Sequence, residues 1–542
     1  IDGLDACLAD GHAAGGGTGA APTAEAMQRH DFEPVRQMPT NRTSIREKSF
    51  VDFQNDVTGK DINLAVQEGF QSIEHVKRYT TTGMATDQGK TSNLNALGIV
   101  ANALDLTPPE IGTTTFRPPY TPTTFGAFAG PARGALFDPE RVTPMHDWAV
   151  AKGAKFEDVG LWKRAWYFPR GRETMIDAVQ RECAAVRESV GIFDATTLGK
   201  IEVVGPDAAE FLNRIYTNSW LKLKPGRCRY GLMLKEDGYI MDDGVVARIA
   251  DNRFHVTTTT GGAPRVLAHM EDYLQTEFTD LSLSLTSVTE QWAVIAVQGP
   301  NARGVIAPLT ADIDMSNDAF PHMAMREGRI CGVPCRLFRV SFTGEAGYEI
   351  NVPADYGLAV WEAVYAAGQP YEITPYGTET MHVLRAEKGF IIVGQETDGT
   401  VTPNDVGLDG LVSKVKTDFV GKRSLARPDL MADNRKQLVG LLTVDPSIVL
   451  DEGAQIVEDP GAAIPMPMLG HVTSSYRSPN VTDSSDTTDT KAAPGRSIAL
   501  GLVAGGRQRL GTRLFATTRD GFAEVQVAKP VFVDPEGGRT NV

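Results

Sequence analysis

The sequence predicts an α+β protein with a helical N-terminal block, a large α+β domain containing antiparallel sheet, and a small C-terminal β-barrel. Between about Val142 and Arg427, runs with helical spacing of apolar residues alternate with short strand-like runs. After Arg427 the helical spacing fades, and short strands separated by turns remain. From these changes of pattern we set domain boundaries at 1–29, 30–135, 136–433 and 434–542.

The composition is that of an ordinary soluble globular protein. With 542 residues, of which 42% are hydrophobic and 22% charged, the chain is long enough for three or four domains. A formal net charge of −15 argues against nucleic acid and anionic membranes as partners. No apolar run reaches the length of a membrane span and no signal-peptide pattern opens the chain, so we expect a cytoplasmic protein.

The cysteines argue for reduced thiols and against a metal site. All five are scattered along the chain, which suits the cytosol better than a disulfide framework. The pair in Cys331-Gly-Val-Pro-Cys335 has the wrong spacing for the common zinc sites and no nearby histidine. We therefore expect no bound metal.

The first 29 residues predict a short helix and a linker. Ile1–Ala14 is rich in alanine, and Gly15–Ala26 consists of small residues typical of a flexible connection. Because the chain begins with isoleucine rather than methionine, we expect it to be processed or to be part of a longer polypeptide.

Residues 30–135 are expected to form a mostly helical linking domain. The run Asp61–Phe70 has helical spacing, with its first residue as N-cap. Lys77–Asn93 is polar and rich in hydroxyl groups. It resembles a phosphate-binding loop, but five residues separate Gly83 from Gly89 where that motif needs four. The loop is therefore either solvated or closes over a ligand or a partner subunit.

The two larger domains are predicted from the following elements. Residues 136–433 contain helices Glu173–Val190 and Asp207–Tyr216, strands Lys200–Val204 and Trp292–Gln298, and a hairpin-like element over Leu337–Glu349. The barrel strands are Val439–Val444, Pro467–Thr473, Ser497–Val503, Arg513–Thr517 and Val525–Val533. The low-complexity run Ser478–Pro494 predicts a disordered surface loop.

A hairpin around Gly238–Val246 carries two adjacent carboxylates, Asp242 and Asp243. Successive side chains on a strand point to opposite faces, so one carboxylate should face solvent or the turn and the other should point inward. An inward carboxylate needs a partner or a ligand to satisfy it. The alternative is a turn-capping pair without chemistry.

An ordered set of motifs favours a particular family. The motifs are Ser189-Val-Gly-Ile-Phe-Asp194, Tyr230, Gly238–Asp243, Gln298-Gly-Pro300, Phe342-Thr-Gly-Glu-Ala-Gly-Tyr-Glu349 and Asp418-Phe-Val-Gly-Lys422. Together they resemble the folate-binding aminomethyltransferase of the glycine cleavage system, from about Phe137 to the C-terminus.

A narrower resemblance covers nearly the whole chain. It rests on Phe50–Asp56, Glu74–Thr80, Phe116–Tyr120, Tyr376–Glu379, Leu384–Phe390 and Gly394–Thr400. These segments are similar to the large (alpha) subunit of heterotetrameric sarcosine oxidase, of which this chain resembles the C-terminal part. On that reading, residues 1–29 are the end of the subunit's NAD-holding dinucleotide-binding domain plus a linker.

The resemblance implies an oxidoreductase subunit that works with beta, gamma and delta subunits. FMN and FAD are held at or by a partner subunit, which oxidises sarcosine and yields glycine and hydrogen peroxide. The folate-binding domain captures the released carbon on tetrahydrofolate as 5,10-methylene-tetrahydrofolate.

The resemblance also implies roles for single residues. Asp243 matches the catalytic carboxylate near folate N10, which stabilises positive charge on the folate nitrogens and can relay a proton. Glu349 matches the carboxylate that accepts hydrogen bonds from the pterin 2-amino group and ring N–H, a donor pair that suits two oxygens. Tyr230 matches a residue lining the pterin slot.

Other positions depart from the family's residues. Leu198 stands at a methionine, and Phe342 and Phe390 stand at tyrosines; all three keep an apolar folate-binding wall, but the two phenylalanines lose hydroxyl contacts. Ala247 also replaces a tyrosine, which leaves the folate orientation open.

Several charged or polar side chains outside this set have expected roles. In the loop Lys77–Asn93, we expect a flavin or its phosphate to be met by Arg78, Thr86 and Lys90. We expect a structural ion pair or interface charges at Arg385 and Glu387, and packed imidazoles at His75 and His382.

Two alternatives compete with the oxidase subunit. One is a stand-alone aminomethyltransferase, which the additional block 30–135 disfavours. The other is a non-catalytic folate-domain scaffold for flavin subunits. Such a scaffold has no need for two enclosed carboxylates, so Asp243 and Glu349 argue against it.

Overall fold

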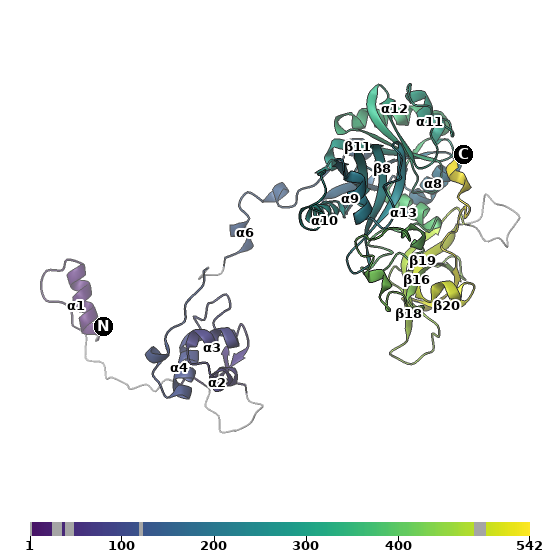
Figure 1. Ribbon diagram of the computed structural model, residues 1–542. Helices are drawn as coiled ribbons and strands as arrows, with labels where there is room; N and C mark the ends of the chain where they lie inside the picture. The colour runs from purple at the N-terminus through teal and green to yellow at the C-terminus, as the bar shows by residue number, and fades with distance from the viewer. Residues whose placement is uncertain (1–2, 24–34, 38–47, 119–122, 482–494, 542) are drawn as a thin grey trace. The chain divides into compact units, whose positions relative to one another are not determined.

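The structure is a computed structural model that describes residues 3–23, 35–37, 48–118, 123–481 and 495–541. The chain falls into two compact units, Ile1–Asp138 and Pro139–Val542, which Figure 1 shows in ribbon form. Most of the predicted disordered loop Ser478–Pro494 lies outside the described residues.

The smaller unit is built mainly from short helices, four of which pack around one apolar cluster. Its helices are α1 (Leu4–Ala14), α2 (Gly59–Gln67), α3 (Ile73–Thr80), α4 (Asn93–Leu104), α5 (Pro108–Ile111) and α6 (Phe125–Phe128), and a two-stranded antiparallel sheet joins β1 (Phe50–Asp52) to β2 (Val57–Thr58). Buried side chains at helical spacing, among them Ile62, Val76 and Val100, form its core.

Two expectations for this unit need correction. The N-cap of α2 is Thr58 and not Asp61, because the Thr58 hydroxyl caps the Asp61 amide while the Asp61 carboxylate accepts from the Thr58 amide at 2.7 Å. The polar loop begins at Thr81 rather than Lys77, since Lys77 lies in α3 with its ammonium buried against the Thr115 carbonyl at 2.6 Å.

The larger unit is organised by an eleven-stranded sheet. Neighbouring strands are antiparallel, apart from the parallel pair of β5 and β15. In spatial order the strands are β10 (Ser284–Ser287), β6 (Gly199–Val204), β9 (Arg253–Thr258), β8 (Ile240–Ala250), β7 (Arg227–Leu234), β12 (Ala324–Ile330), β13 (Val333–Arg339), β14 (Gly347–Pro353), β11 (Trp292–Gln298), β5 (Gly191–Asp194) and β15 (Thr374–Pro375).

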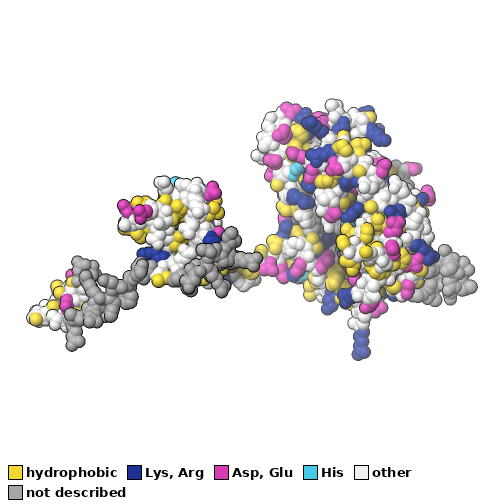
Figure 2. Space-filling model, turned by 90° about the horizontal axis from the view of Figure 1, so that it is seen from below, with side chains coloured by type: hydrophobic (Ala, Val, Ile, Leu, Met, Phe, Trp, Pro, Cys, Tyr) yellow, Lys and Arg dark blue, Asp and Glu magenta, His cyan; other side chains and the backbone are white. Residues whose placement is uncertain are grey.

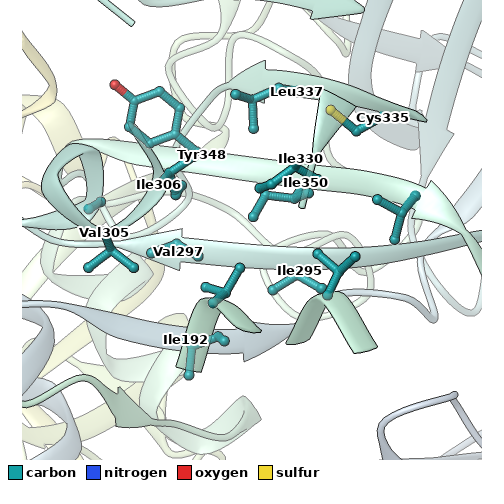
Figure 3. Close-up of a cluster of buried hydrophobic side chains, with 14 of the residues drawn as sticks. Ile192, Ile295, Val297, Val305, Ile306, Ile330, Cys335, Leu337, Tyr348 and Ile350 are labelled. Atoms are coloured by element: carbon teal, nitrogen blue, oxygen red, sulfur yellow. The ribbon is translucent and has the colours of Figure 1, made fainter. Parts of the chain in front are cut away.

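Helices pack against this sheet through apolar side chains. They are α7 (His146–Ala151), α8 (Met175–Glu188), α9 (Ala208–Ile215), α10 (Ala263–Thr276), α11 (Ala302–Ile306), α12 (Gly357–Ala367) and α13 (Thr378–Glu387), with a separate hairpin of β3 (Lys155–Val159) and β4 (Trp162–Tyr167). Figure 3 shows one cluster, in which Ile295 and Val297 of β11 lie with Ile350 of β14 and with Val305 and Ile306 of α11. In β11, the alternate residues Ala293, Ile295 and Val297 are buried in this cluster.

The C-terminal part closes into a six-stranded barrel. Its strands are β16 (Lys436–Thr443), β19 (Arg496–Ala504), β18 (Met468–Ser478), β17 (Gln455–Val457), β20 (Arg513–Thr518) and β21 (Gly521–Ala528). The expected end of the last strand at Val533 is wrong. Pro530 offers no N–H to a ladder, and the amides of Phe532 and Val533 instead donate to the Glu387 carbonyl.

These features confirm the predicted α+β class with a C-terminal barrel. Helix α13 lies next to the barrel (Figure 1), and its buried Arg385 pairs with Glu396 at 2.7 Å and donates to Ser474 of β18. Glu387 pairs with Arg187 of α8 at 2.7 Å. Both residues thus form buried structural ion pairs, but with other partners than each other, because residues two apart on a helix face different directions.

Two further features concern the lengths of the helices and the surface of the larger unit. None of the described helices is both long and apolar enough to cross a membrane. On the face of the larger unit seen in Figure 2, basic, acidic and apolar side chains are interspersed.

Candidate functional site

The β7–β8 hairpin brings Tyr230 and Asp243 into direct contact. Its turn closes at Gly238, whose φ of +91° favours glycine, with the Lys235 amide donating to the Tyr239 carbonyl. Tyr230 pairs with Val245, and Asp243 with Leu232, so Tyr230 and Asp243 share one sheet face. The Tyr230 hydroxyl donates to Asp243 Oδ2.

Asp242 lies on the opposite face of β8 and is fully buried. Its carboxylate accepts from the Thr259 hydroxyl at 3.0 Å and from the Asp243 amide at 2.8 Å. The two carboxylates point to opposite faces as expected, with Asp242 directed inward and Asp243 only half-buried. Thr259, just before α10, covers Asp242, and Tyr230 holds the half-buried Asp243.

Burial changes the acid–base behaviour of this pair. It raises the pKa of Asp243 to about 7, and the charge of Asp242 acts in the same direction, while the Tyr230 hydrogen bond opposes the rise. Burial and the Asp243 charge also raise the pKa of Tyr230, which keeps the phenol neutral as a donor. A carboxyl that titrates near neutrality is well suited to accept and release a proton.

Glu349 occupies β14 between Ala296 of β11 and Phe338 of β13. It is half-buried, and its carboxylate accepts no hydrogen bond from the described residues. Burial raises the pKa of Glu349 to about 7, and Lys200 lowers it against that effect. An enclosed carboxylate without protein donors costs stability unless a ligand supplies them.

The apolar residues proposed for the wall fall into two places. Phe342, in the loop between β13 and β14, stacks on Phe390, which follows α13, with ring centroids 6.1 Å apart and 21° between planes. Both rings are 37% exposed. Leu198, in the turn between β5 and β6, packs half-buried against the cluster that contains Phe193. Within the described residues, no hydrogen bond or ring contact joins these groups to Glu349 or Asp243.

The three residues expected to meet a flavin lie in the smaller unit, and each already has a protein partner. Arg78 pairs with Glu74 at 2.6 Å. Thr86 bonds Gln54 at 3.1 Å, and Lys90 is not free either.

Two buried cations near the site were not singled out by the sequence analysis. Arg187 of α8 uses all five N–H donors, on the carbonyls of Thr343 and Leu384 and on the carboxylates of Glu345 and Glu387. In the sequence, Arg187 lies one helical turn after Cys183, on the buried face of α8. This spacing is the signal that could have identified it. Lys200, inside a short strand of mostly apolar residues that also contains Glu202, was the second such signal.

Comparisons with known proteins decide the family. The model of the GCVT N-terminal domain matches residues 145–416. An aminomethyltransferase of Streptomyces coelicolor is 32% identical, over 59% of this chain and 84% of that protein. The chain belongs to the GCVT family. In the crystal structure of the glycine cleavage system aminomethyltransferase T from Bartonella henselae, the same fold covers 73% of this chain and 98% of that one, at a TM-score of 0.61 and 24% identity.

Further matches extend beyond the GCVT region. The model of the sarcosine oxidase A3 domain matches residues 46–131. The sarcosine oxidase subunit alpha of Corynebacterium sp. (strain P-1) is 51% identical over 99% of this chain, and that of Rhizobium meliloti (strain 1021) is 46% identical over 92%. The alignments cover 58% and 49% of those proteins, so the chain spans about half the length of the curated relatives it matches. Both resemblances drawn from the motifs are thereby confirmed.

Proposed function

We propose that this GCVT-family chain is the folate-binding part of a sarcosine oxidase alpha subunit. In the assembled enzyme, sarcosine, tetrahydrofolate and dioxygen yield glycine, 5,10-methylene-tetrahydrofolate and hydrogen peroxide. The observation that carries the proposal is two half-buried carboxylates on one sheet, Asp243 held by Tyr230 and Glu349 without a partner among the described residues. They occur in a chain 51% identical to a sarcosine oxidase subunit alpha.

The proposal includes the rest of the assembly. Residues 1–29 are the end of a dinucleotide-binding domain that holds NAD, 30–135 the linking domain, 136–433 the folate domain and 434–542 the barrel. Beta, gamma and delta subunits complete a cytoplasmic enzyme with FMN and FAD at or on a partner. Arg78, Thr86 and Lys90 would have to exchange their present contacts to meet flavin.

Glu349 binds the pterin ring of the folate in this proposal. A reduced pterin ring presents its 2-amino group and a ring N–H side by side, and a carboxylate can accept both. These two bonds provide the donors that the protein itself does not give Glu349. Charge-assisted hydrogen bonds of this kind contribute about 1.5–3 kcal/mol each.

Asp243 accepts a proton in the proposed reaction. When the carbon bridges N5 and N10 of the folate, two new C–N bonds form and the folate nitrogens release protons. A carboxylate of pKa about 7 accepts such a proton and stabilises the positive charge that precedes its loss. Tyr230 fixes the orientation of Asp243 by donating to Oδ2, and the Phe342–Phe390 stack offers an apolar wall for the ring system.

The test is direct binding of tetrahydrofolate to the full chain, followed by turnover in the assembled complex. We expect Asp243→Asn to retain binding and to lose formation of the methylene product. Asp251→Asn, at an exposed position just past the end of the same strand, is the matched control. A wild-type chain that binds no reduced folate would contradict the proposal.

The second candidate is a stand-alone aminomethyltransferase, favoured by the 98% coverage of the Bartonella henselae enzyme by this fold. The two candidates differ in what purifies with the chain. Flavin and smaller subunits that copurify support the oxidase subunit, whereas a flavin-free single chain supports the transferase.

A further inference from the structure

Lys200 is a fully buried lysine on β6. Its ammonium donates to the carbonyls of Thr196 at 2.7 Å and Leu198 at 2.8 Å, and in the described part of the chain it forms no ion pair. A buried ammonium is costly, because the two carbonyls satisfy only two of its three N–H groups and do not neutralise its charge.

The sheet curls so that β6 comes to face β13 and β14. Arg336 of β13 pairs with Glu202 of β6 at 2.7 Å and contacts His255 of β9 at 3.1 Å. Glu202 lies two residues after Lys200 on the same face of β6, and Arg336 lies two residues before Phe338, the register partner of Glu349. The ion pair that closes the curl therefore brings Lys200 toward Glu349.

Three carboxylates act electrostatically on Lys200, and two of them have other partners. Asp194 of β5 accepts from the Thr143 hydroxyl at 2.6 Å and from the Thr196 amide at 3.0 Å. Glu290, just before β11, pairs with Arg141. Glu349 has neither a hydrogen bond nor an ion pair with any described residue. Of the three carboxylates, Glu349 is therefore the one that has no other partner among the described residues.

Other titratable groups lie around the two residues, among them the Arg336–Glu202 ion pair. His255 and Arg141 lie near Lys200, while Cys228 of β7 and Tyr376 after β15 lie near Glu349. Burial dominates the pKa shifts of His255, Cys228 and Tyr376 and favours the neutral form of each side chain. Lys200 is therefore the cation positioned to favour an ionised Glu349.

We propose that Lys200 is a positioning residue of the folate site, which keeps Glu349 ionised for the pterin and holds the turn that carries Leu198. This inference rests on the proposed folate function. Its consequence is that Lys200 sets the pH range over which reduced folate binds.

The acid–base properties of the two residues agree with this role. Burial lowers the pKa of Lys200 to about 8, which leaves it mostly protonated at pH 7. Burial raises the pKa of Glu349 to about 7, and Lys200 is the charge that opposes the rise. Without Lys200 the pKa of Glu349 moves higher, and at pH 7 the carboxyl is then a neutral acid that cannot accept both pterin donors.

The experiment measures the affinity of the full chain for tetrahydrofolate, by calorimetry under anaerobic conditions, between pH 6 and 9. For the wild type we expect affinity to rise with pH through about 7 and then level off. For Lys200→Met we expect the midpoint to move up by about one pH unit, with an affinity loss of about fivefold at pH 7 that shrinks toward pH 9. Lys200→Arg, which keeps the charge, should restore the wild-type midpoint.

Three further measurements complete the test. Lys222→Met, at an exposed site, should change nothing. In a Glu349→Gln background, Lys200→Met should no longer alter the pH dependence. An affinity loss that is equal at every pH, with an unmoved midpoint, would mean a merely structural lysine and would overturn the inference.

The titration of Glu349 separates this inference from the folate proposal. Carboxyl NMR of the ligand-free chain follows Glu349 directly, and Lys200→Met should raise its titration midpoint. If the wild-type chain binds no reduced folate, the proposed function is wrong. The NMR titration of Glu349 still tests the role of Lys200. An unchanged Glu349 midpoint would refute it.

Discussion

Glu349→Gln should have opposite effects on stability and on binding. The substitution keeps the shape of the side chain but removes the charge. In the ligand-free protein the ionised carboxylate is half-buried without donors from the described residues, so removing its charge should stabilise the fold. In the complex the same charge accepts the pterin donors, so its removal should weaken folate binding.

The magnitude follows from the pKa of Glu349. The folded-state pKa of about 7 lies above the ordinary glutamate value of 4.5. The group therefore contributes stability that is fully present below pH 4.5 and is lost as pH rises to 7. A pKa difference of this size corresponds to about 3 kcal/mol of unfolding free energy. The Glu349→Gln variant has no carboxyl at this position to titrate, so it does not lose that free energy as pH rises. The variant should exceed the wild type in unfolding free energy by less than about 1 kcal/mol at pH 5 and by about 3 kcal/mol at pH 8.

The binding loss of Glu349→Gln should equal one charge-assisted hydrogen bond, because the amide oxygen can still accept from one of the two pterin donors. At about 1.5–3 kcal/mol, the dissociation constant for tetrahydrofolate rises by about 10- to 150-fold at pH 8. Glu349→Ala should lose about 2–3 kcal/mol of binding free energy.

Urea unfolding at pH 5 and pH 8, together with calorimetric titration of folate, measures both effects. Glu362→Gln, on the exposed side of α12, is the control and should change neither. A Glu349→Gln variant that is less stable than the wild type at pH 8 would show that Glu349 has a structural partner. Unchanged folate affinity would remove Glu349 from the binding site.

Three other perturbations test separate parts of the structure. In the assembled complex, Asp243→Ala should leave flavin reduction by sarcosine intact and slow methylene-tetrahydrofolate formation by about a hundredfold, with free formaldehyde released instead; equal slowing of both steps in stopped-flow and formaldehyde-trapping assays would place Asp243 in the oxidation site. Arg385→Ala, which leaves the fully buried Glu396 without its cation, should lower the unfolding free energy by about 3–5 kcal/mol, whereas Arg513→Ala in the exposed pair with Glu524 should stay within about 1 kcal/mol. Gly244→Ala places a Cβ 1.9 Å from the Thr257 carbonyl oxygen and should lower the melting temperature, while Gly261→Ala, with open space around it, should not.

Local patterns predicted the fold class and the boundaries of the long elements. The apolar run Trp292–Gln298 is β11 residue for residue, because a fully buried strand has an unmistakable composition. Strand β17 has three residues and was missed, since so short a segment carries no period. Strand alternation correctly put Asp242 and Asp243 on opposite faces, but the contact of Asp242 with Thr259 depends on tertiary packing.

For the candidate site too, local patterns predicted one part and tertiary packing decides the other. The motifs identified Tyr230, Asp243 and Glu349, and the hairpin register explains why the first two meet. The Lys200 position depends on an ion pair between residues 134 apart in sequence, Glu202 and Arg336. Such a contact follows from the curl of the whole sheet, which no local period encodes.

The Arg187 cluster affects when the aromatic wall can form during synthesis. Glu345, three residues after Phe342 in the same loop, pairs with Arg187 and also with Arg539, 194 residues further along the chain. In Figure 1 the C-terminus accordingly lies close to α8. At about 5–20 residues per second, a ribosome needs about 10–40 s to reach Arg539 after making Glu345. The loop that carries Phe342 therefore gains this ion pair only after Arg539 has been made, and until then a nascent chain carries an incomplete site.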